Sequence, residues 1–227
     1  MTTADKTSGR RLPRRVTQLF AGLVLYGVSM ALMVESQLGL NPWDVFHQGV
    51  SKVSGLSFGW VVLLTGVPVM LLWIPLRQRP GFGTIANLVV IGFVADAALA
   101  VLPTAGHLAV RVAFLLGGIL LNGIATGLYL GTRLGPGPRD GLMTGVVNRF
   151  PNRSVRLVRT SIEVLVLATG WLLGGTVGIG TVAYAVGIGP LAQVFIRLFT
   201  VAAPPADTGT IGTGTTGFPP RPAEATC

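Results

Sequence analysis

Four polar side chains lie inside long apolar segments of the sequence, where a charge is costly and is therefore a candidate for function. Three are acids, Asp96, Glu35 and Glu163, and the fourth is the amide Gln193. A carboxylate inside a membrane can bind a cation or carry a proton, and it usually faces protein rather than lipid. These residue types predict a site for a cation, a proton-coupled solute or an amine-bearing solute.

Each acid also has a structural interpretation. Asp96 could pair with Arg111 at the outer end of the next apolar segment. Glu163 follows Arg159 by four residues, which is the spacing of an ion pair on one helix face. Glu35 lies near the end of its segment on a face of small residues, so we expect it to meet another helix and not lipid.

A motif that occurs twice positions these side chains. The stretch LGLNPWDVFHQGV at 38–50 returns 96 residues later as LGPGPRDGLMTGV at 134–146. The two copies share glycine, proline and aspartate in register. A second pair of stretches, GFGTIA at 81–86 and GIGTVA at 178–183, matches at an offset of 97. Self-similarity at one fixed period indicates an internal duplication.

The duplication also relates the polar positions to one another. Gln193 is the counterpart of Asp96, so both are expected to face one central seam. The counterpart of Glu35 is the last of three glycines at four-residue spacing, which are Gly123, Gly127 and Gly131. Small residues at this spacing let two membrane helices approach closely.

Each copy of the motif is expected to begin a short helix. Proline is favoured at the first helical position, because its missing N–H has no partner there in any case. The aspartate two residues later meets the positive end of the helix dipole. The residues at these starts are Asn41, Pro42, Asp44, Pro138 and Asp140, with Asn41 as N-cap. The sequence leaves open whether the helices, 42–53 and 138–150, are interfacial or re-entrant.

Composition identifies a polytopic membrane protein. Hydrophobic residues make up 50% of the chain and charged residues 11%, against about 25% in a soluble domain. The formal charge is +9, and the basic residues responsible for it lie mainly between the apolar segments. The predicted partner is therefore a lipid bilayer and not nucleic acid. Six segments approach the length of about 20 residues that crosses a bilayer. They are 16–37, 57–76, 83–102, 109–131, 157–175 and 180–200.

The basic residues predict the orientation. With the N-terminus inside, all of the 17 lysines and arginines except Lys52 and Arg111 lie on the inner side. Both termini are then cytoplasmic, and three spans per half make the two halves an inverted repeat. The predicted organisation is a basic N-terminus (1–15), two membrane repeats (16–102 and 109–200) and a disordered tail (201–227). Each repeat carries its short helix after its first span.

The chain resembles the YczE/YyaS/YitT group of bacterial integral membrane proteins. The likeness rests on GLNPWD at 39–44, GPGPRDGLM at 135–143 and GIGT at 178–181, and it covers about residues 15–200. It implies a multi-pass protein of the bacterial inner membrane. It implies no reaction.

Two functions remain open on the sequence. The first is a transporter of a small solute, since inverted repeats with interrupted segments and sparse intramembrane acids are typical of secondary transporters. The second is a non-transporting membrane protein that binds or assembles a partner complex. No motif for a metal, a phosphate group or a catalytic triad is present, so we expect neither an enzyme nor a cofactor. Homo-oligomerisation stays open.

Overall fold

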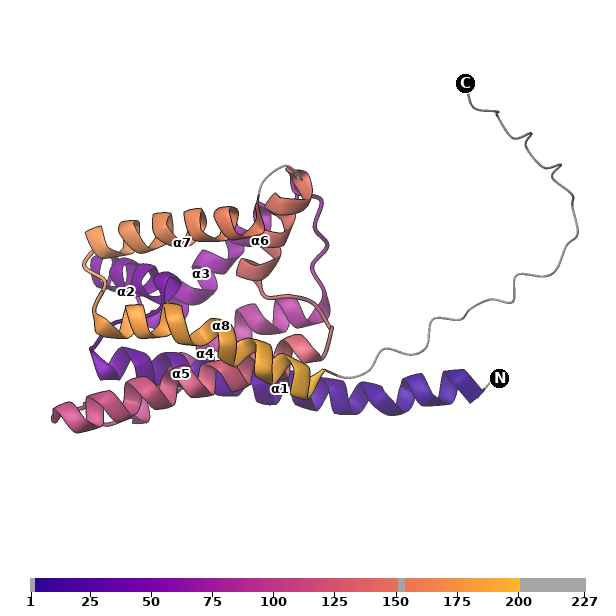
Figure 1. Cartoon of the computed structure of the whole chain (residues 1–227), viewed down its shortest axis with the longest axis horizontal. Helices are drawn as coiled ribbons and strands as arrows, with labels where there is room; N and C mark the ends of the chain where they lie inside the picture. The colour runs from indigo at the N-terminus through magenta and orange to yellow at the C-terminus, as the bar shows by residue number, and fades with distance from the viewer. Residues whose placement is uncertain (1–2, 151–153, 201–227) are drawn as a thin grey trace, which may run out of the picture.

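Eight α-helices make up the described part of the chain, residues 3–150 and 154–200, in a computed structural model (Figure 1). The all-helical class is therefore as predicted, and the predicted tail at 201–227 lies outside the described residues. The helices are α1 (Thr3–Ser36), α2 (Pro42–Ser54), α3 (Phe58–Leu71), α4 (Phe82–Val101), α5 (Leu108–Gly131), α6 (Pro138–Arg149), α7 (Val155–Leu172) and α8 (Ile179–Phe199).

Four helices are long and apolar enough to cross a membrane: α1 from Leu12 onward, α4, α5 and α8. The pair α2 and α3 is bent by 112° and counts together as one further broken span or re-entrant loop. By length and composition, four or five of the six predicted spans are thus able to cross a membrane. The remaining helix, α7, is 18 residues long and carries Arg156, Arg159 and Glu163.

The helices form two layers (Figure 1). In one layer α1 packs on α5 and on α4, and α5 packs on α8. The other layer contains α2, α3, α6 and α7. Its packing crosses between the halves, because α2 packs on α7 and α6 packs on α3. The first turns of α2, with Trp43 and Asp44, are buried against protein.

Matching backbone hydrogen bonds join the two halves. The amide of Gly83, at the start of α4, donates to the carbonyl of Leu134 at 3.0 Å. The amide of Gly180, at the start of α8, donates to the carbonyl of Leu38 at 2.8 Å. Each bond ties a helix start in one half to the motif loop of the other half. The stretches that repeat in the sequence are therefore the ones in mutual contact.

The loop glycine of each motif copy has no room for a side chain. Gly39 and Gly135 have φ values of 122° and 131°, which favour glycine. A Cβ at Gly39 would lie 2.8 Å from the hydroxyl oxygen of Thr181, and one at Gly135 would lie 2.8 Å from that of Thr84. These approaches explain why glycine and threonine recur together at the repeat period.

The glycines of the predicted packing face lie where α5 contacts α8. A Cβ at Gly127 would lie 2.5 Å from the backbone carbonyl carbon of Phe195, so only a glycine fits there without movement. The partners across the contact follow the same four-residue spacing. For Gly123, Gly127 and Gly131 they are Leu191, Phe195 and Phe199, respectively.

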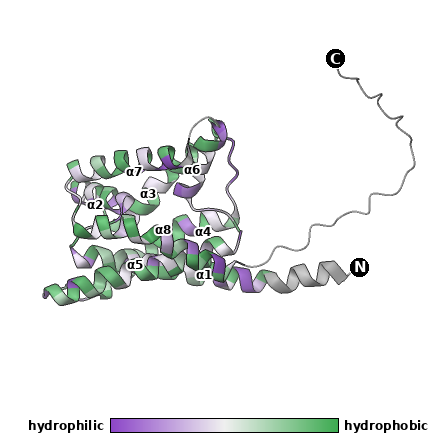
Figure 2. Ribbon diagram, in the orientation of Figure 1, coloured by the Kyte–Doolittle hydropathy of each residue, from purple (hydrophilic) through white to green (hydrophobic). Residues whose placement is uncertain are grey.

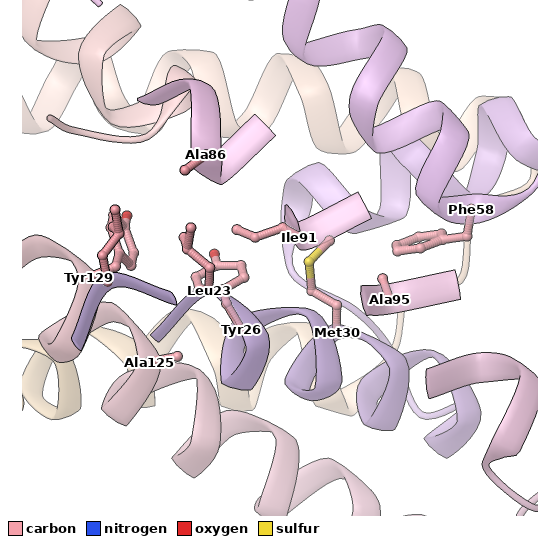
Figure 3. Close-up of a cluster of buried hydrophobic side chains, with 10 residues drawn as sticks. Leu23, Tyr26, Met30, Phe58, Ala86, Ile91, Ala95, Ala125 and Tyr129 are labelled. Carbon is pink, nitrogen blue, oxygen red and sulfur yellow. The ribbon is translucent and has the colours of Figure 1, made fainter. Parts of the chain in front are cut away.

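A buried apolar cluster holds α1 against α3, α4 and α5 (Figure 3). The rings of Tyr26 and Tyr129 meet edge to face in it, with their centroids 6.0 Å apart. This contact joins α1 of the first half to α5 of the second. The members include Leu23, Tyr26, Met30, Phe58, Ala86, Ile91, Ala95, Ala125 and Tyr129.

Large apolar side chains also cover outer faces of the bundle. Figure 2 shows hydrophobic residues along most of α5 and α8. Leu116 on α5 and Val186 on α8 are among the exposed ones. Soluble monomers rarely expose contiguous apolar surface of this extent, whereas lipid-facing helices do so routinely. The chain is a multi-pass membrane protein.

Candidate functional site

A cavity of about 380 Å³ lies where the starts of α2 and α6 meet. Helices α1, α4, α5, α7 and α8 complete its walls, and its volume falls in the range of about 300–1,000 Å³ typical of small-molecule sites. The motif copies contribute Asn41, Pro42, Trp43, Gly137, Pro138, Arg139 and Asp140 to the lining.

The start of α2 is capped by a side chain. Asn41 is its N-cap, as the motif predicts, and the side-chain oxygen of Asn41 accepts from the amide of Asp44 at 3.0 Å. The carboxylate of Asp44 accepts in turn from the side-chain amide of Asn41. Its other oxygen lies 3.4 Å from Nδ1 of His47 without hydrogen-bonding geometry. Asp44 and His47 thus form a buried pair behind the cavity wall.

The start of α6 is built differently. Its N-cap is Gly137, so no side chain caps the helix. The aspartate of this copy, Asp140, accepts a hydrogen bond from the hydroxyl of Tyr129. The first N–H groups of α6 therefore lack the side-chain acceptor that Asn41 gives to α2, and they belong to residues that line the cavity.

Arg139 occupies in the second motif copy the position that Trp43 has in the first. Its guanidinium donates to the hydroxyl of Tyr26 at 3.1 Å and lies 5.8 Å from the ring centroid of Trp43, near the outer limit of about 6 Å for a cation–π contact. Within the described residues no carboxylate forms an ion pair with this guanidinium. Arg139 therefore presents to the cavity a charge that is not in ion-pair contact with Asp44 or Asp140, the acids whose charges attract it.

A polar network supports the wall formed by α8. The hydroxyl of Tyr184 donates to Oδ1 of Asn122 at 3.0 Å, and Nδ2 of Asn122 donates to the hydroxyl of Ser29 at 2.8 Å. Asn122 and Ser29 are fully buried, where an unsatisfied polar group would be strongly unfavourable. The network links α8, α5 and α1 and fixes the position of the Tyr184 hydroxyl.

Two of the four polar residues predicted from the sequence line the cavity. Glu163 and Gln193 belong to its wall. Arg159 donates to Glu163 at 2.9 Å, which is the same-helix ion pair expected from their spacing. Glu35 is not part of the wall, and its Oε2 atom is buried without a hydrogen-bond partner among the described residues.

Asp96 lies outside the cavity wall and forms hydrogen bonds to the start of α3. Its carboxylate accepts from the hydroxyl of Ser57 and from the amide of Gly59, with distances of 2.5 and 2.6 Å. These bonds hold α4 to the start of α3. The alternative pairing with Arg111 is wrong, because Arg111 donates to the carbonyl of Ala105 at 3.0 Å instead.

The sequence analysis did not single out the tyrosines or Arg139 of the cavity. Tyr26, Tyr129 and Tyr184 all line it, but a tyrosine in an apolar segment carries no signal of its own. Arg139 did carry one, since a charged residue stands between the proline and the aspartate of the motif where the first copy has tryptophan. Among the described residues no group of three or more His, Cys, Asp or Glu side chains could hold a metal ion.

Comparisons with known proteins place the chain in a family. Residues 13–197 match a family described as a family of unknown function, DUF6198. A protein from Haemophilus influenzae described as uncharacterized is 41% identical over 185 residues, which cover 82% of this chain and 84% of that protein.

Two Bacillus subtilis proteins are also similar. The uncharacterized membrane protein YczE is 31% identical over 179 residues, covering 78% of this chain and 83% of YczE. The uncharacterized protein YyaS is 28% identical over 181 residues, covering 78% of this chain and 90% of YyaS. No solved structure matches the chain. The match over nearly all of the membrane region shows that this chain belongs to the YczE-like family of membrane proteins, DUF6198.

Proposed function

We propose that this protein transports a small solute and that the central cavity is its solute site. The observation that carries the proposal is the meeting of both motif copies at one cavity of about 380 Å³. Secondary transporters typically bind their solute at the interface of two repeats, where helices are interrupted. Asp140 and Glu163 in the cavity wall favour a cationic, amine-bearing or proton-coupled solute.

The proposal includes an inverted orientation of the two halves in the bacterial inner membrane. The matched bonds of Gly83 and Gly180 support a two-fold relation between the halves. The distribution of basic residues favours cytoplasmic termini. With α3 and α7 counted as spans, six segments cross the membrane. In this arrangement α2 lies toward the outer side and α6 toward the inner side.

Cysteine accessibility in intact cells tests this orientation. After Cys227 is replaced, Lys52→Cys should be labelled by an impermeant thiol reagent from outside. Arg79→Cys and Arg149→Cys should react only after the membrane is opened. All three positions are exposed, so they differ only in the side of the membrane on which the proposal places them. Labelling of position 149 in intact cells would contradict the inverted arrangement.

The two halves differ where the third and fourth helices of each half meet. In the first half α3 packs on α4, and a Cβ at Gly92 would lie 2.6 Å from the carbonyl oxygen of Gly59. In the second half the position equivalent to Gly92 is Gly189, and a Cβ there has no described atom within 4 Å. The pair α7 and α8 is not among the closely packed helix pairs of the described chain.

The polar contacts show the same difference. Asp96 bonds to Ser57 at the N-cap of α3. Their counterparts are Gln193, which lines the cavity, and Ser154, the N-cap of α7, which makes no side-chain cap bond. In the proposed orientation the α3–α4 contact is an outer gate that is closed, and the α7–α8 gap is an inner gate that is open. Asp96 then acts in the gate and not in solute binding.

Solute flux into proteoliposomes tests the proposed function. Vesicles that contain the purified protein and an imposed proton gradient are incubated with a bacterial cytoplasmic extract, and the trapped solutes are identified by mass spectrometry. We expect at least one small solute to accumulate above the level in vesicles with heat-denatured protein. No accumulation in either gradient direction, with folded protein present, would favour the non-transporting, partner-binding function.

A further inference from the structure

We infer that Arg139 binds the carboxylate of the transported solute and that this solute is amphoteric, carrying an amine beside the carboxylate. The inference rests on the proposed function, because it assigns a ligand class to the same cavity. It adds a carboxylate to the amine expected from the acids of the cavity wall.

The guanidinium of Arg139 has no ion-pair partner among the described residues. A guanidinium has five N–H donors and stays protonated in proteins. Only its bond to the hydroxyl of Tyr26 is found within the described residues, and no carboxylate there pairs with it. A charge in the interior of a membrane protein normally has an ionic partner. A solute carboxylate in the cavity would supply that partner.

Two of the neighbouring acids already have partners of their own. Asp44 is bonded to Asn41, and Glu163 is paired with Arg159. Neither acid forms an ion pair with Arg139. The guanidinium is thus the charged group of the cavity that retains most of its donors, and its planar fork suits the two oxygens of a carboxylate.

The start of α6 lies beside Arg139 in the cavity wall. No side chain caps this helix, and Gly137 at its N-cap lies beside the side-chain amide of Asn87. A Cβ on Gly137 would lie 3.3 Å from the amide nitrogen of Asn87 and 3.4 Å from both the amide oxygen of Asn87 and Oδ2 of Asp140, and all three residues line the cavity. The carboxylate that binds Arg139 would therefore also meet an amide donor, and an amine on the same solute would meet the carboxylate of Asp140.

The charge of the cavity wall argues for an amine on the same solute. Arg139 and Arg159 are balanced by Asp140 and Glu163, so a zwitterion adds no net charge whereas a simple anion does. Asp140 follows Arg139 directly in the first turn of α6, and its carboxylate, with one bond from Tyr129, has acceptor capacity left. Adjacent positive and negative groups match an α-amino acid.

Thermal unfolding of the full-length protein in detergent tests the inference. The probes are three mixtures: the standard amino acids, the amines left by their decarboxylation, and the carboxylic acids left by their deamination. We expect the amino acids to raise the melting temperature most, since a ligand that binds only the folded state stabilises it. Arg139→Gln should weaken this effect by about tenfold or more in amino-acid concentration.

Two further variants keep the test informative. Arg79→Gln removes an exposed arginine outside the cavity and should respond like the unchanged protein. Arg139→Lys keeps the charge without the planar fork, so this variant should bind amino acids more weakly than the unchanged protein does. If Arg139→Gln does not fold, the amino-acid response of Arg139→Lys is compared with that of the unchanged protein and tests the assignment instead. An undiminished response in Arg139→Lys would then overturn the assignment.

The remaining outcomes separate this inference from the proposed function. Equal stabilisation by the amines, or an undiminished response in Arg139→Gln, would overturn the assignment of a carboxylate to Arg139. Stabilisation by phosphate or by anionic lipid alone would overturn it too, since the occupant would then be a phosphate group. Amino-acid binding without flux in proteoliposomes would contradict transport and leave the ligand class intact.

Discussion

Gly189→Leu should leave the protein folded and lower solute flux by about tenfold or more. No described atom lies within 4 Å of a Cβ built at this position, so the leucine has space in the open arrangement of α7 and α8. Transport by alternating access requires these helices to close. Overpacking typically costs about 1–3 kcal/mol, and about 2 kcal/mol in the closed form corresponds to roughly a thirtyfold loss of its population.

Gly92→Leu is the matched variant in the other half. A Cβ there would meet the carbonyl oxygen of Gly59 at 2.6 Å, so the leucine should force α4 from α3. This variant should lower the melting temperature, and Gly189→Leu should not. Flux measured at equal amounts of reconstituted protein separates the two effects. Normal flux with Gly189→Leu would mean that α7 and α8 do not close during transport.

Gly127→Leu should cause the largest loss of folded protein. The new side chain would begin 2.5 Å from the backbone of Phe195, and backbone cannot move aside as a flexible side chain can. Overpacking at such a contact destabilises by about 1–3 kcal/mol, and the contact between α5 and α8 also forms one wall of the cavity. The melting temperature in detergent and the amount of protein in the membrane fraction measure the effect.

Gly117→Leu is the control on the same helix. No described atom lies within 4 Å of a Cβ at this position, so the leucine should be accepted there. Both substitutions replace glycine by leucine in α5. They differ in that Gly127 faces α8, whereas Gly117 faces no described helix at this distance. Equal melting temperatures for the two variants would show that the glycine face of α5 is not needed for packing.

The helix starts could be predicted from the sequence because their causes are local. Proline and its preceding cap specify where α2 and α6 begin, and both helices begin at the expected proline. The glycines at four-residue spacing likewise indicated a close helix contact. That α8 is the partner of this face depends on how the chain folds back, which no local pattern specifies.

The cavity residues depended on contacts between the halves and could not be predicted. Because α2 packs on α7 and α6 packs on α3, both motif copies line one cavity. Asp96 and Gln193 are equivalent in sequence, but Asp96 bonds to the start of α3 while Gln193 lines the cavity. A repeat pattern predicts equivalent positions, and it does not predict how their contacts differ.

The central claim is that the cavity is reached from opposite sides of the membrane in turn. Thr126 lines the cavity, so Thr126→Cys reports its accessibility to an impermeant thiol reagent once Cys227 is replaced. Ser57→Cys and Asp96→Cys, at side chains that are hydrogen-bonded here, allow the outer gate to be locked by oxidation. We predict labelling of position 126 from both sides without the lock and from the inner side alone with it. Labelling from outside that persists in the locked protein would contradict the account.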